Sequence, residues 1–551
     1  MEKYYTPIIL FIVFTAIVIG YDYIERKKRE REIYLHIKEN FGKVHSEKFK
    51  GPIDGIYNRL GGNLTDITYN DLNLDEIIKE MNHCASQMGI EYFYYRIRNL
   101  ILNSNILQEM QNKRNMYENK EKDIINIQFA LSNVGYFKEN VLGLIEEDVE
   151  IEKGLEITTK IFSFTLLYII VAIIFLKNKA AIVSLLLIAT NVYIYKEFNK
   201  KTLGKLNALI KIKNIIFVAD KLTKSNDLIF GEELSELRSI LKEIKPLKST
   251  LRSFGYFTGN PQLDFAETYK NILFLSEARK YSNSQKYFKI YKEDIKKLYY
   301  LLGKIDAEIA IISISKAYDT KDAIFSDNIR GIDLYNPLLK SAVPNDLNLN
   351  KSILLTGSNA SGKSTYLRTC GINAVFALSF GIFFGESLEI EPVIITSAID
   401  ISDSITKNLS YFMAESKAIG EMIKNDEKKL ILLDEIFRGT NTIDRISAAT
   451  ATLEFLSKNN YVIAATHDIE LTVLLEDDFK NMHFEEHIID GDINFDYILK
   501  EGPARTRNAI AILENLRYPN TITKKARDIA ITMEEKWKFT LLGMVKLSGI
   551  S

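Results

Sequence analysis

A nine-residue loop constrains the fold of this chain more than any other feature of its sequence. Residues 353–356 form a short apolar run, residues 366–380 have a helical pattern, and the sequence between them is GSNASGKST. The loop consists of Gly357, Ser358, Asn359, Ala360, Ser361, Gly362, Lys363, Ser364 and Thr365. A buried strand, this loop and a helix, in that order, predict a phosphate-binding loop.

Separate roles are expected for the side chains of this loop. Gly357 and Gly362 let the backbone curl so that successive N–H groups point at phosphate oxygens. Lys363 supplies positive charge to the outer phosphates, and the Ser364 hydroxyl is a ligand for Mg²⁺. The following helix directs its positive N-terminal end at the same phosphates. The loop therefore predicts a site for a nucleotide and Mg²⁺.

Two further apolar runs, LILL and YVIAAT, lead directly into polar side chains. The first run ends in Asp434 and Glu435, and the second is followed by His467. As buried strands, these runs deliver their last side chains beside the phosphates. Asp434 would then hold the metal's water shell, Glu435 would act as general base, and His467 would sense the γ-phosphate or orient the attacking water. An ordinary acidic pair and a structural histidine are the alternatives.

The chain divides into a helical part and an α/β part. At 551 residues, it is too long for one compact domain. Residues 70–150 and 200–320 show helical periodicity, as in the stripe Ile78, Met81, Ala85, Met88, Tyr92 and Tyr95. Residues 330–551 instead alternate short apolar runs with helical segments, which predicts a parallel sheet with flanking helices.

Residues 4–23 are almost entirely apolar and are about as long as a membrane span. The segment ERKKRER follows directly, without a small-residue cleavage site. An uncleaved transmembrane anchor is therefore expected, and a signal peptide is the alternative. By the positive-inside rule, the basic cluster at residues 26–31 stays in the cytoplasm.

A second apolar region forms two arms, residues 161–176 and 180–195, separated by Lys177, Asn178 and Lys179. Each arm is apolar on all sides, which predicts a transmembrane helical hairpin. A helix pair buried in a soluble core is the alternative. The hairpin would leave the rest of the chain after residue 24 on the cytoplasmic side.

Charge and cysteine content exclude two classes of protein. The chain has 71 Lys and Arg and 72 Asp and Glu, so a generally basic nucleic-acid binder is excluded. Cys84 and Cys370 are too few for a disulfide framework, and we expect buried thiols. Basic stretches such as KEFNKKTLGK at residues 196–205 adjoin the apolar runs, where they could contact anionic lipid or DNA, or simply be solvated.

The sequences GSNASGKSTYLRT, LILLDEIFRGTNTIDRISAATATLEFL and YVIAATHDIEL together resemble the ATPase domain of the MutS family. NLSYFMAES at residues 408–416 is similar to the family's signature segment, in which a serine reaches the γ-phosphate bound by the other subunit. Ser410 is the matching position. The resemblance continues to residue 530, and residues 74–116 resemble the family's helical core more loosely. It implies a homodimer that hydrolyses ATP with Mg²⁺.

The apolar runs and the resemblance together give the following expected organisation. A transmembrane anchor at 1–23 is followed by helical core at 24–155, a membrane hairpin at 156–196, helical core and lever at 197–329, and the ATPase domain at 330–551 with a C-terminal dimerisation segment. The family's mismatch-reading domain, with its Phe-x-Glu motif, has no room before the helical core. Phe265-Ala-Glu267 and Phe484-Glu-Glu486 fit that motif by coincidence.

The family resemblance leaves two outputs for the nucleotide cycle. One is DNA binding at the membrane, and the other is mechanical work on a protein or on the membrane itself. We expect a multi-pass protein of the cell membrane, in contact with membrane lipid, whose ATPase domain is cytoplasmic. The DNA structure, the protein partner and the pathway do not follow from the sequence.

Overall fold

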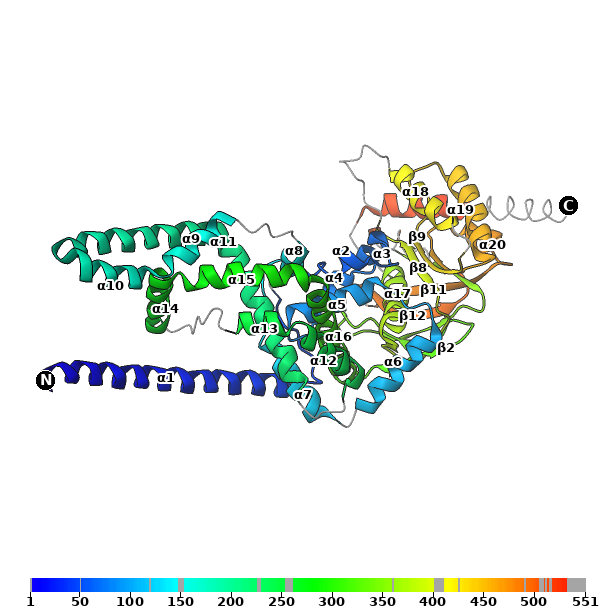
Figure 1. The fold of residues 1–551 in the computed structure, drawn as a ribbon. Helices are drawn as coiled ribbons and strands as arrows, with labels where there is room; N and C mark the ends of the chain where they lie inside the picture. Colours follow the sequence, from blue (N-terminus) through cyan, green and yellow to red (C-terminus); the bar gives the residue numbers. More distant parts are fainter. Residues whose placement is uncertain are drawn as a thin grey trace. The chain divides into compact units, whose positions relative to one another are not determined.

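The computed structural model describes two compact units, each built from segments that are distant in the sequence (Figure 1). The first unit contains residues 1–62, 77–99 and 109–319, and the second contains residues 63–76, 100–108 and 320–551. The described residues are 2–49, 51–117, 120–146, 153–224, 229–252, 261–358, 361–400, 411–424, 427–489, 492–504, 510, 513–514 and 518–532. Residues 1–62 include a helix, α1, from Glu2 to Asn40.

Helices make up the first unit. They are α2 (Tyr57–Leu60), α5 (Gln87–Arg98), α7 (Glu121–Ser132), α8 (Val141–Glu146), α9 (Lys153–Phe162), α10 (Thr165–Leu176), α11 (Ala180–Leu222), α12 (Gly231–Glu243), α13 (Lys245–Leu251), α14 (Pro261–Phe274), α15 (Ser276–Ile290) and α16 (Lys292–Tyr318). Two more, α4 (Leu74–Glu80) and α6 (Ser104–Tyr117), begin in the second unit and end in the first. The predicted helical character of this part is thus confirmed.

The spacing of the apolar stripe across residues 78–95 predicts one continuous helix. In the structure, the stripe does not lie on one helix. The chain leaves helical conformation between α4 and α5, and Ser86 caps α5 by accepting a hydrogen bond from the Gly89 N–H at 3.2 Å. Asp306 of α16 fixes this break, because its buried carboxylate accepts from the Ala85 N–H and the Ser86 hydroxyl. The stripe residues nevertheless belong to the packed interior, with Met81 and Met88 fully buried.

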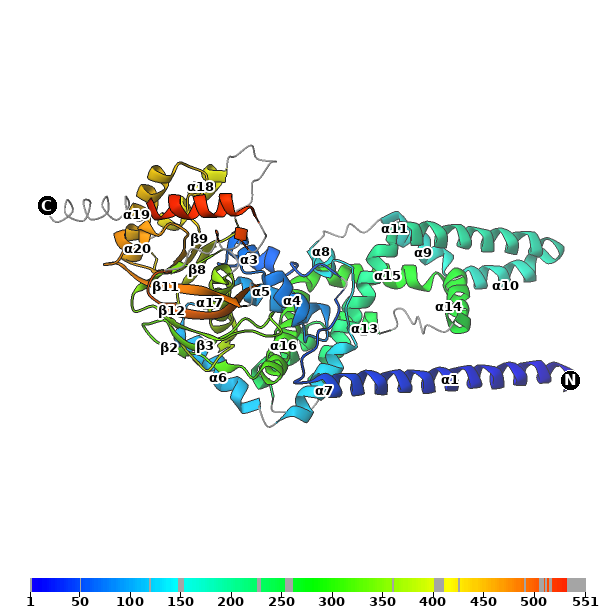
Figure 2. The same ribbon diagram turned by 180° about the vertical axis from the view of Figure 1, so that it is seen from behind.

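The predicted hairpin is present as two antiparallel helices, α10 and α11, joined by a 3-10 turn at Lys177–Lys179 (Figures 1 and 2). Its first arm is shorter than predicted, because α9 ends at Phe162 and α10 starts at Thr165. Hydroxyl groups at the break bond to backbone carbonyls, including Ser163 to Lys160 and Thr165 to Phe162, and so compete with regular helical bonding.

Among the described residues, one stretch, Thr165–Lys200, is long and apolar enough to cross a membrane. Its mean hydropathy is 2.1, and only 11% of its apolar window is buried. A core helix of a soluble protein would be mostly buried. The expected anchor at residues 4–23 is helical within α1, but the side chains of its first nine residues, 4–12, lie outside the described set.

Strands and helices together make up the described part of the second unit. The strands are β1 (Lys321–Asp322), β2 (Ile324–Phe325), β3 (Arg330–Leu334), β4 (Asn345–Asn348), β5 (Ser352–Thr356), β6 (Ile382–Phe383), β7 (Ser387–Ile390), β8 (Ile394–Ala398), β9 (Lys429–Asp434), β10 (Tyr461–Ala465), β11 (Phe479–Ile489) and β12 (Asp492–Glu501). The helices include α3 (Asp66–Asp71), α17 (Lys363–Phe380), α18 (Tyr411–Ile423), α19 (Thr442–Ser457) and α20 (Glu470–Leu474), and residues 520–532 are also helical.

The main sheet has the order β12-β11-β5-β10-β9-β8. The five strands from β11 to β8 are parallel, whereas β12 pairs antiparallel with β11. The sheet is therefore mixed, not purely parallel as predicted, because its edge strand β12 runs antiparallel to β11. The unit also has a sheet of four strands (β2-β7-β3-β4) and a sheet of two strands (β1-β6). These two sheets were not predicted from the sequence.

Helices cover both faces of the main sheet, as the continuous apolar strands predicted. Alternate residues Ile431 and Leu433 of β9 join a core cluster with Leu453 of α19 and Ile419 of α18. Leu432, between them, faces α17 instead, since a Cβ on Gly371 would meet its Cδ1 at 2.8 Å. The predicted strands at 353–356 and 430–433 are confirmed as parts of β5 and β9, and the predicted strand at 461–466 is confirmed as β10, which ends one residue earlier, at Ala465.

Candidate nucleotide site

Three neighbouring parallel strands bring the predicted site residues to one edge of the sheet. β5, β10 and β9 are adjacent, with Leu355 opposite Ala465 and Ala465 opposite Asp434 in register. The phosphate loop follows β5, His467 follows β10, and Asp434 is the last residue of β9. Ligands of open α/β sheets bind at the carboxyl ends of the strands, so this edge is the candidate site.

The phosphate loop has the backbone conformation that its glycines predict. Gly357 has φ +142° and Gly362 has φ +106°, values that L side chains rarely adopt. A Cβ on Gly357 would lie 2.9 Å from the backbone oxygen of Phe484, so the loop also requires the missing side chain for space. Gly362 directly precedes α17, whose first N–H groups open toward the loop. Asn359 and Ala360 lie outside the described residues.

Lys363, the first residue of α17, is buried within the phosphate loop. Its ammonium group donates hydrogen bonds to the carbonyl oxygens of Gly357 at 2.7 Å and Ser358 at 2.8 Å. Burial lowers the pKa of Lys363 to about 8, although the carboxylates of Asp434 and Glu435 act in the opposite direction. A cation held in this way is positioned for an anion that enters the loop, since the backbone carbonyls neutralise none of its formal charge.

Ser364 and Asp434 form the part of the site that fits Mg²⁺. The Ser364 hydroxyl donates to Oδ2 of Asp434, and the other carboxylate oxygen, Oδ1, is buried without a hydrogen-bond partner. Burial raises the pKa of Asp434. Mg²⁺ prefers hard oxygen ligands and keeps several waters, so a hydroxyl and an unsatisfied carboxylate oxygen are a suitable donor set. Bound there, the ion would neutralise charge on the phosphates.

Glu435 occupies a left-handed backbone position, with φ +52°, and its N–H donates to the Ala465 carbonyl at 2.9 Å. One carboxylate oxygen lies 2.6 Å from Nε2 of His467, and the other lies 2.6 Å from Nε of Arg438. Burial alone would raise the pKa of Glu435, but the hydrogen bond from His467 and the nearby positive charges hold it below its ordinary value. The carboxylate is therefore ionised at neutral pH, as a general base requires.

His467 links the carboxylate to the phosphate loop. Its Nε2 lies 3.3 Å from the Lys363 ammonium as well as 2.6 Å from Glu435. The next residue, Asp468, is held by a two-pronged ion pair with Arg445 of α19, at 2.8 and 2.7 Å. This ion pair holds Asp468 against α19 and so helps to position the adjacent residue, His467.

Several polar residues at this site were not singled out from the sequence. Arg438 pairs with Glu435, and Glu415 of α18 accepts a hydrogen bond from the Phe437 N–H, which also has a left-handed φ of +64°. Burial raises the pKa of Glu415. Glu486 of β11 accepts from the Ser358 hydroxyl at 2.7 Å. The spacing from Glu435 to Arg438 could have suggested the first pair, whereas the other contacts are long-range.

A mostly apolar cavity of about 330 Å³ adjoins the phosphate loop and shares Gly362 and Thr365 with it. Other lining residues are Leu334, Leu339, Val343, Tyr366 and Tyr497. Tyr366 is buried, and its hydroxyl donates to the Asp346 carbonyl at 2.8 Å. A mostly apolar cavity beside a phosphate loop has the size and lining expected for the base and sugar of a nucleotide.

A buried carboxylate from early in the sequence braces the same unit. Asp71, at the end of α3, accepts hydrogen bonds from the Ser397 hydroxyl at 2.6 Å and from the N–H groups of Ile399 and Asp400 at 2.9 and 3.1 Å. Arg368 of α17 donates to the Asp71 carbonyl at 2.8 Å. Asp71 thus connects the end of β8 to the helix that begins at Lys363.

Comparison with known proteins shows what the α/β part of the chain is similar to. Residues 353–534 match MutS domain V. That domain is a P-loop ATPase domain, so the match agrees with the loop, the strand order and the paired carboxylates described above. The resemblance predicted from the sequence is confirmed for this part of the chain.

Curated MutS proteins are similar over the same C-terminal part. The DNA mismatch repair protein MutS of Thermus thermophilus is 30% identical over 241 residues, which cover 42% of this chain and 30% of that protein. The protein of the same name from Bacillus licheniformis is 29% identical over 263 residues, 45% of this chain and 30% of its own length. DNA mismatch repair protein MutS 2 of Haloarcula marismortui is 27% identical over 267 residues, 42% and 28% of the two lengths. The matched part spans less than a third of each relative.

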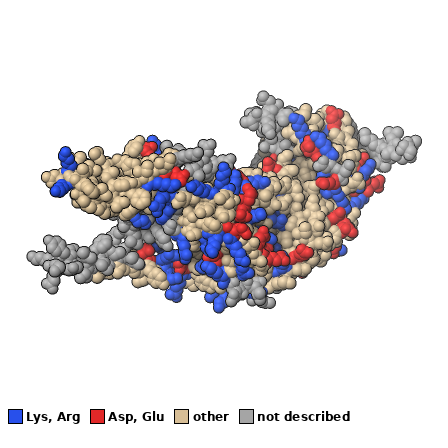
Figure 3. All heavy atoms as spheres, viewed as in Figure 1, with Lys and Arg blue, Asp and Glu red and all other residues tan. Residues whose placement is uncertain are grey.

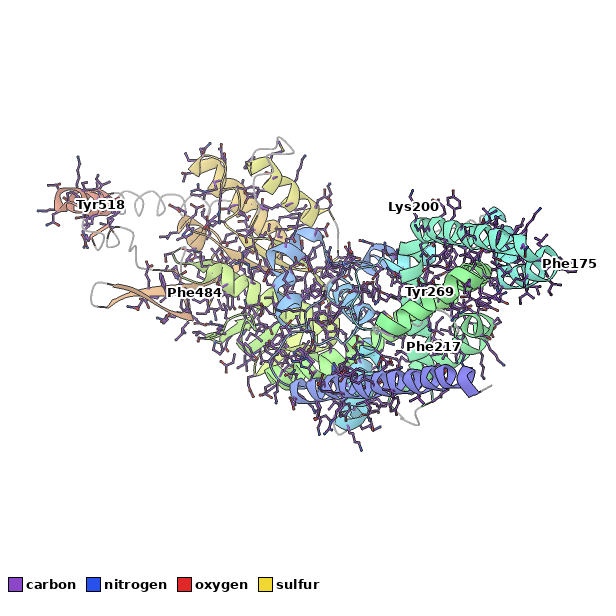
Figure 4. All side chains as sticks on the ribbon, turned by 90° about the vertical axis from the view of Figure 1, so that its left-hand side faces the viewer. Phe175, Lys200, Phe217, Tyr269, Phe484 and Tyr518 are labelled. Carbon is purple, nitrogen blue, oxygen red and sulfur yellow. The ribbon has the colours of Figure 1, made fainter. Side chains whose placement is uncertain are left out.

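Two predictions about MutS-like motifs have different outcomes. Phe484 is 3% exposed on β11, and its ring packs 5.9 Å from that of Tyr366, so this Phe-x-Glu sequence is part of the packed interior, which agrees with the expected coincidence (Figure 4). Ser410 lies outside the described residues, as do residues 401–409 of the segment before it. α18, which begins at Tyr411, is the helix that the resemblance places directly after Ser410.

Proposed function

We propose that this chain is a MutS-like ATPase that hydrolyses ATP with Mg²⁺ at the edge formed by β5, β10 and β9. The observation that carries this proposal is the convergence of Lys363, the Ser364–Asp434 pair and the Glu435–His467 pair at that edge. These groups support the proposal because phosphoryl transfer to water needs a phosphate cradle, a metal-binding pair and a positioned carboxylate base.

The proposed reaction assigns one task to each side chain. Lys363 and the N-terminal end of α17 bind the phosphates, while Ser364 and Asp434 would hold Mg²⁺. Glu435 takes a proton from the attacking water, and His467 keeps the carboxylate oriented and can respond to the outer phosphate. The two partners of Glu435 leave its carboxylate charged, which favours proton abstraction at neutral pH.

We also propose that the working species is a homodimer, as the MutS resemblance implies, with Ser410 reaching the partner's nucleotide. Membrane anchoring through the hairpin of α10 and α11 is part of the same proposal. It is supported by the exposed apolar surface of Thr165–Lys200. Figure 3 shows this surface between basic groups at the tip and at the base of the hairpin.

DNA is the proposed target of the nucleotide cycle, because the similar relatives are named DNA mismatch repair proteins. Mechanical work on a protein or membrane partner is the second candidate, and the exposed apolar hairpin favours it. A DNA-binding titration of the detergent-solubilised protein at several salt concentrations separates the two. Binding that weakens as salt concentration rises supports DNA as the target, because a protein that contacts phosphates releases counterions from DNA. Absence of binding even at low salt favours the second candidate.

Phosphate release from ATP tests the enzymatic part. We expect release by the parent protein in the presence of Mg²⁺ and much less by the Lys363→Ala variant. Equal release by the two proteins, or none by a folded parent that binds ATP, contradicts the proposal.

A further inference from the structure

A third helix, α14, packs against both helices of the apolar hairpin. Figures 1 and 2 show that α14 runs across the axis of α10 and α11, at the end of α10 that is distant from the turn. A helix parallel to the hairpin would extend it, whereas one that crosses it lies along the surface of any membrane that the hairpin enters. The direction of α14 therefore bears on where that surface would be.

Asn191 of α11 holds α14 in this place. Its side chain is fully buried, and its Nδ2 donates to the carbonyl oxygens of Ile272 and Leu273 at 3.0 and 3.1 Å. Its Oδ1 lies 3.1 Å from the Thr165 hydroxyl oxygen. The last carbonyls of a helix lack partners within the helix, so the amide of Asn191 caps the C-terminal end of α14. In an apolar environment such bonds are kept, because the alternative is an unsatisfied polar group.

The hairpin arms beyond this junction are too short to cross a bilayer alone. α10 and the part of α11 from Ala180 to Asn191 have twelve residues each, which at about 1.5 Å per residue gives roughly 18 Å. The hydrocarbon core is about 30 Å thick. If Asn191 lay at the cytoplasmic edge of the hydrocarbon core, Lys177 and Lys179 would end inside the hydrocarbon, where a charge is costly.

The exposed side chains of α14 suit the boundary layer between lipid headgroups and acyl chains. Tyr269 and Phe274 are 52% and 41% exposed, although both carry large aromatic rings. Lys270 is exposed beside them. Aromatic residues are enriched at membrane interfaces, and helices in this layer lie about 5 to 10 Å deep. By contrast, the hairpin side chains Phe175 and Leu185 are 77% and 71% exposed and are purely apolar. Figure 4 places Phe175 at the free end of the hairpin and Lys200 further along α11.

We infer that α14 is an interfacial membrane helix, held flat in the lipid boundary layer by Asn191, and that its depth allows the short hairpin to span the bilayer. A junction about 5 to 10 Å deep places the tip of an 18 Å hairpin at about 23 to 28 Å. From there Lys177 and Lys179 reach the far headgroups with their long side chains. This inference rests on the proposed membrane anchoring, and its partner is the lipid bilayer itself.

Fluorescence quenching by lipids tests both steps in the full-length protein. Single cysteines replace Tyr269 on α14 and Leu185 on the hairpin, and each is labelled with an environment-sensitive fluorophore; Cys84 and Cys370 are buried, and the labelled parent protein measures their background. The proteins are reconstituted in vesicles of phosphatidylcholine and phosphatidylglycerol that contain a nitroxide either near the headgroup or deep in the acyl chain. We expect at least twofold stronger quenching by the shallow nitroxide at position 269, and by the deep nitroxide at position 185.

The other outcomes separate the two proposals. Quenching at 185 without quenching at 269, or deep quenching at 269, overturns the interfacial helix and leaves membrane anchoring intact. No quenching at either position overturns both.

A pair of variants isolates the role of Asn191. Asn191→Leu removes the bonds to α14 but keeps the hairpin apolar, so quenching at 269 should fall by at least half while quenching at 185 is unchanged. Thr190→Leu places the same side chain one residue away, where the native hydroxyl bonds to Leu186 of its own helix. Equal quenching at 269 in the two variants rules out Asn191 as the residue that holds α14.

Discussion

Nε2 of His467 lies 2.6 Å from Oε1 of Glu435. This contact joins the ends of β10 and β9, which are adjacent in the sheet but separated in the sequence. The pair couples the carboxylate to the phosphate loop, since the same nitrogen lies 3.3 Å from the Lys363 ammonium. A nucleotide that draws Lys363 toward its phosphates would therefore change the surroundings of His467 and of Glu435 together. In the proposed mechanism, nucleotide binding and water activation would be linked through one imidazole ring.

Substitutions at the two ends of this link should have separable effects. Glu435→Gln keeps the size of the side chain but removes the base, so we expect ATP hydrolysis to fall roughly 10²- to 10⁴-fold with ATP affinity little changed. Lys363→Ala removes charge that acts on bound ATP as well as on the transition state, so ATP affinity should fall. Single-turnover rates and equilibrium ATP binding give the two quantities.

The exposed Glu476 supplies the matched control for the first substitution. Glu476→Gln makes the same chemical change far from the candidate base in the sequence and should hydrolyse ATP at the parent rate. A Glu435→Gln variant that turns over as fast as this control would remove Glu435 from the catalytic role.

Glu91 gives the helical unit a predicted dependence on pH. Its carboxylate is buried, accepts from Tyr299 at 3.0 Å and Gln87 at 3.2 Å, and has one oxygen without a hydrogen-bond partner. Burial raises its pKa to about 7, despite opposing hydrogen bonds and the charge of Arg59. The folded state thus holds a proton that the unfolded state releases near pH 4.5, so stability is highest below that value and is lost as pH rises toward 7.

The size of this effect is on the order of 3 kcal/mol between pH 4.5 and 7, if Glu91 alone is considered. Glu91→Gln mimics the protonated carboxyl, and its unfolding free energy should decline less across this range than that of the parent. Chemical denaturation at pH 5, 6 and 7 measures the difference. Parallel pH profiles for the two proteins would show that Glu91 does not titrate in this range.

Asp71 provides a test of how the α/β unit is braced. Asp71→Asn replaces one acceptor oxygen by an NH₂ group that faces the donors of Ser397, Ile399 or Asp400. We expect a loss of about 2 kcal/mol in stability of this unit and slower ATP hydrolysis, because β8 and α17 lose a common anchor. Asp66→Asn, on the exposed first turn of the same helix, should change thermal unfolding far less.

Local sequence patterns predicted the strand-end residues well, and long-range contacts explain what they missed. Asp434 and His467 follow continuous apolar runs, and strand pairing alone brings them together. Asp71 lies almost 300 residues before the helix that it contacts, so nothing local in its sequence indicates a partner. The left-handed backbone at Glu435 and Phe437 is likewise set by contacts with Ala465 and Glu415, not by glycine.

Periodicity was misleading where a side chain competed with the backbone. The apolar spacing across residues 78–95 predicts one helix, but Asp306 takes the Ala85 N–H and the Ser86 hydroxyl, and the helix breaks there. The hydroxyl bonds of Ser163 and Thr165 shorten the first hairpin arm in a similar way. The spacing of apolar residues indicates which side chains are buried. Whether a helix continues depends also on hydrogen bonds with side chains that can be distant in the sequence.

The membrane proposal predicts a definite topology. A reporter fused after Arg31 or after Lys200 should be cytoplasmic, whereas a reporter inserted at Asn178 should be external, because basic residues concentrate beside the first two positions. Protease protection in intact cells distinguishes the two sides. Extraction of the whole protein by a carbonate wash, without detergent, would contradict membrane insertion altogether.

The dimer proposal predicts complementation between two inactive subunits. Within one subunit, Lys363 is the cation that the described loop presents to the phosphates, and a second helix N-terminus, brought by the partner's Ser410 segment, would complete the stabilisation of developing charge. Such a shared site closes only with nucleotide bound, which ties ATP to the relation between the two subunits. Confinement to a membrane favours closure by raising the effective concentration of the halves.

Mixing Lys363→Ala subunits with Ser410→Ala subunits tests this arrangement. In a mixed dimer, one site lacks both groups, while the other keeps its own Lys363 and receives an intact Ser410 from its partner, so part of the parent activity should return. Differently tagged subunits, purified over both tags, provide proven heterodimers for the measurement. Parent-level hydrolysis by either variant alone, or heterodimers no more active than the separate variants, would mean that each subunit hydrolyses ATP with its own residues.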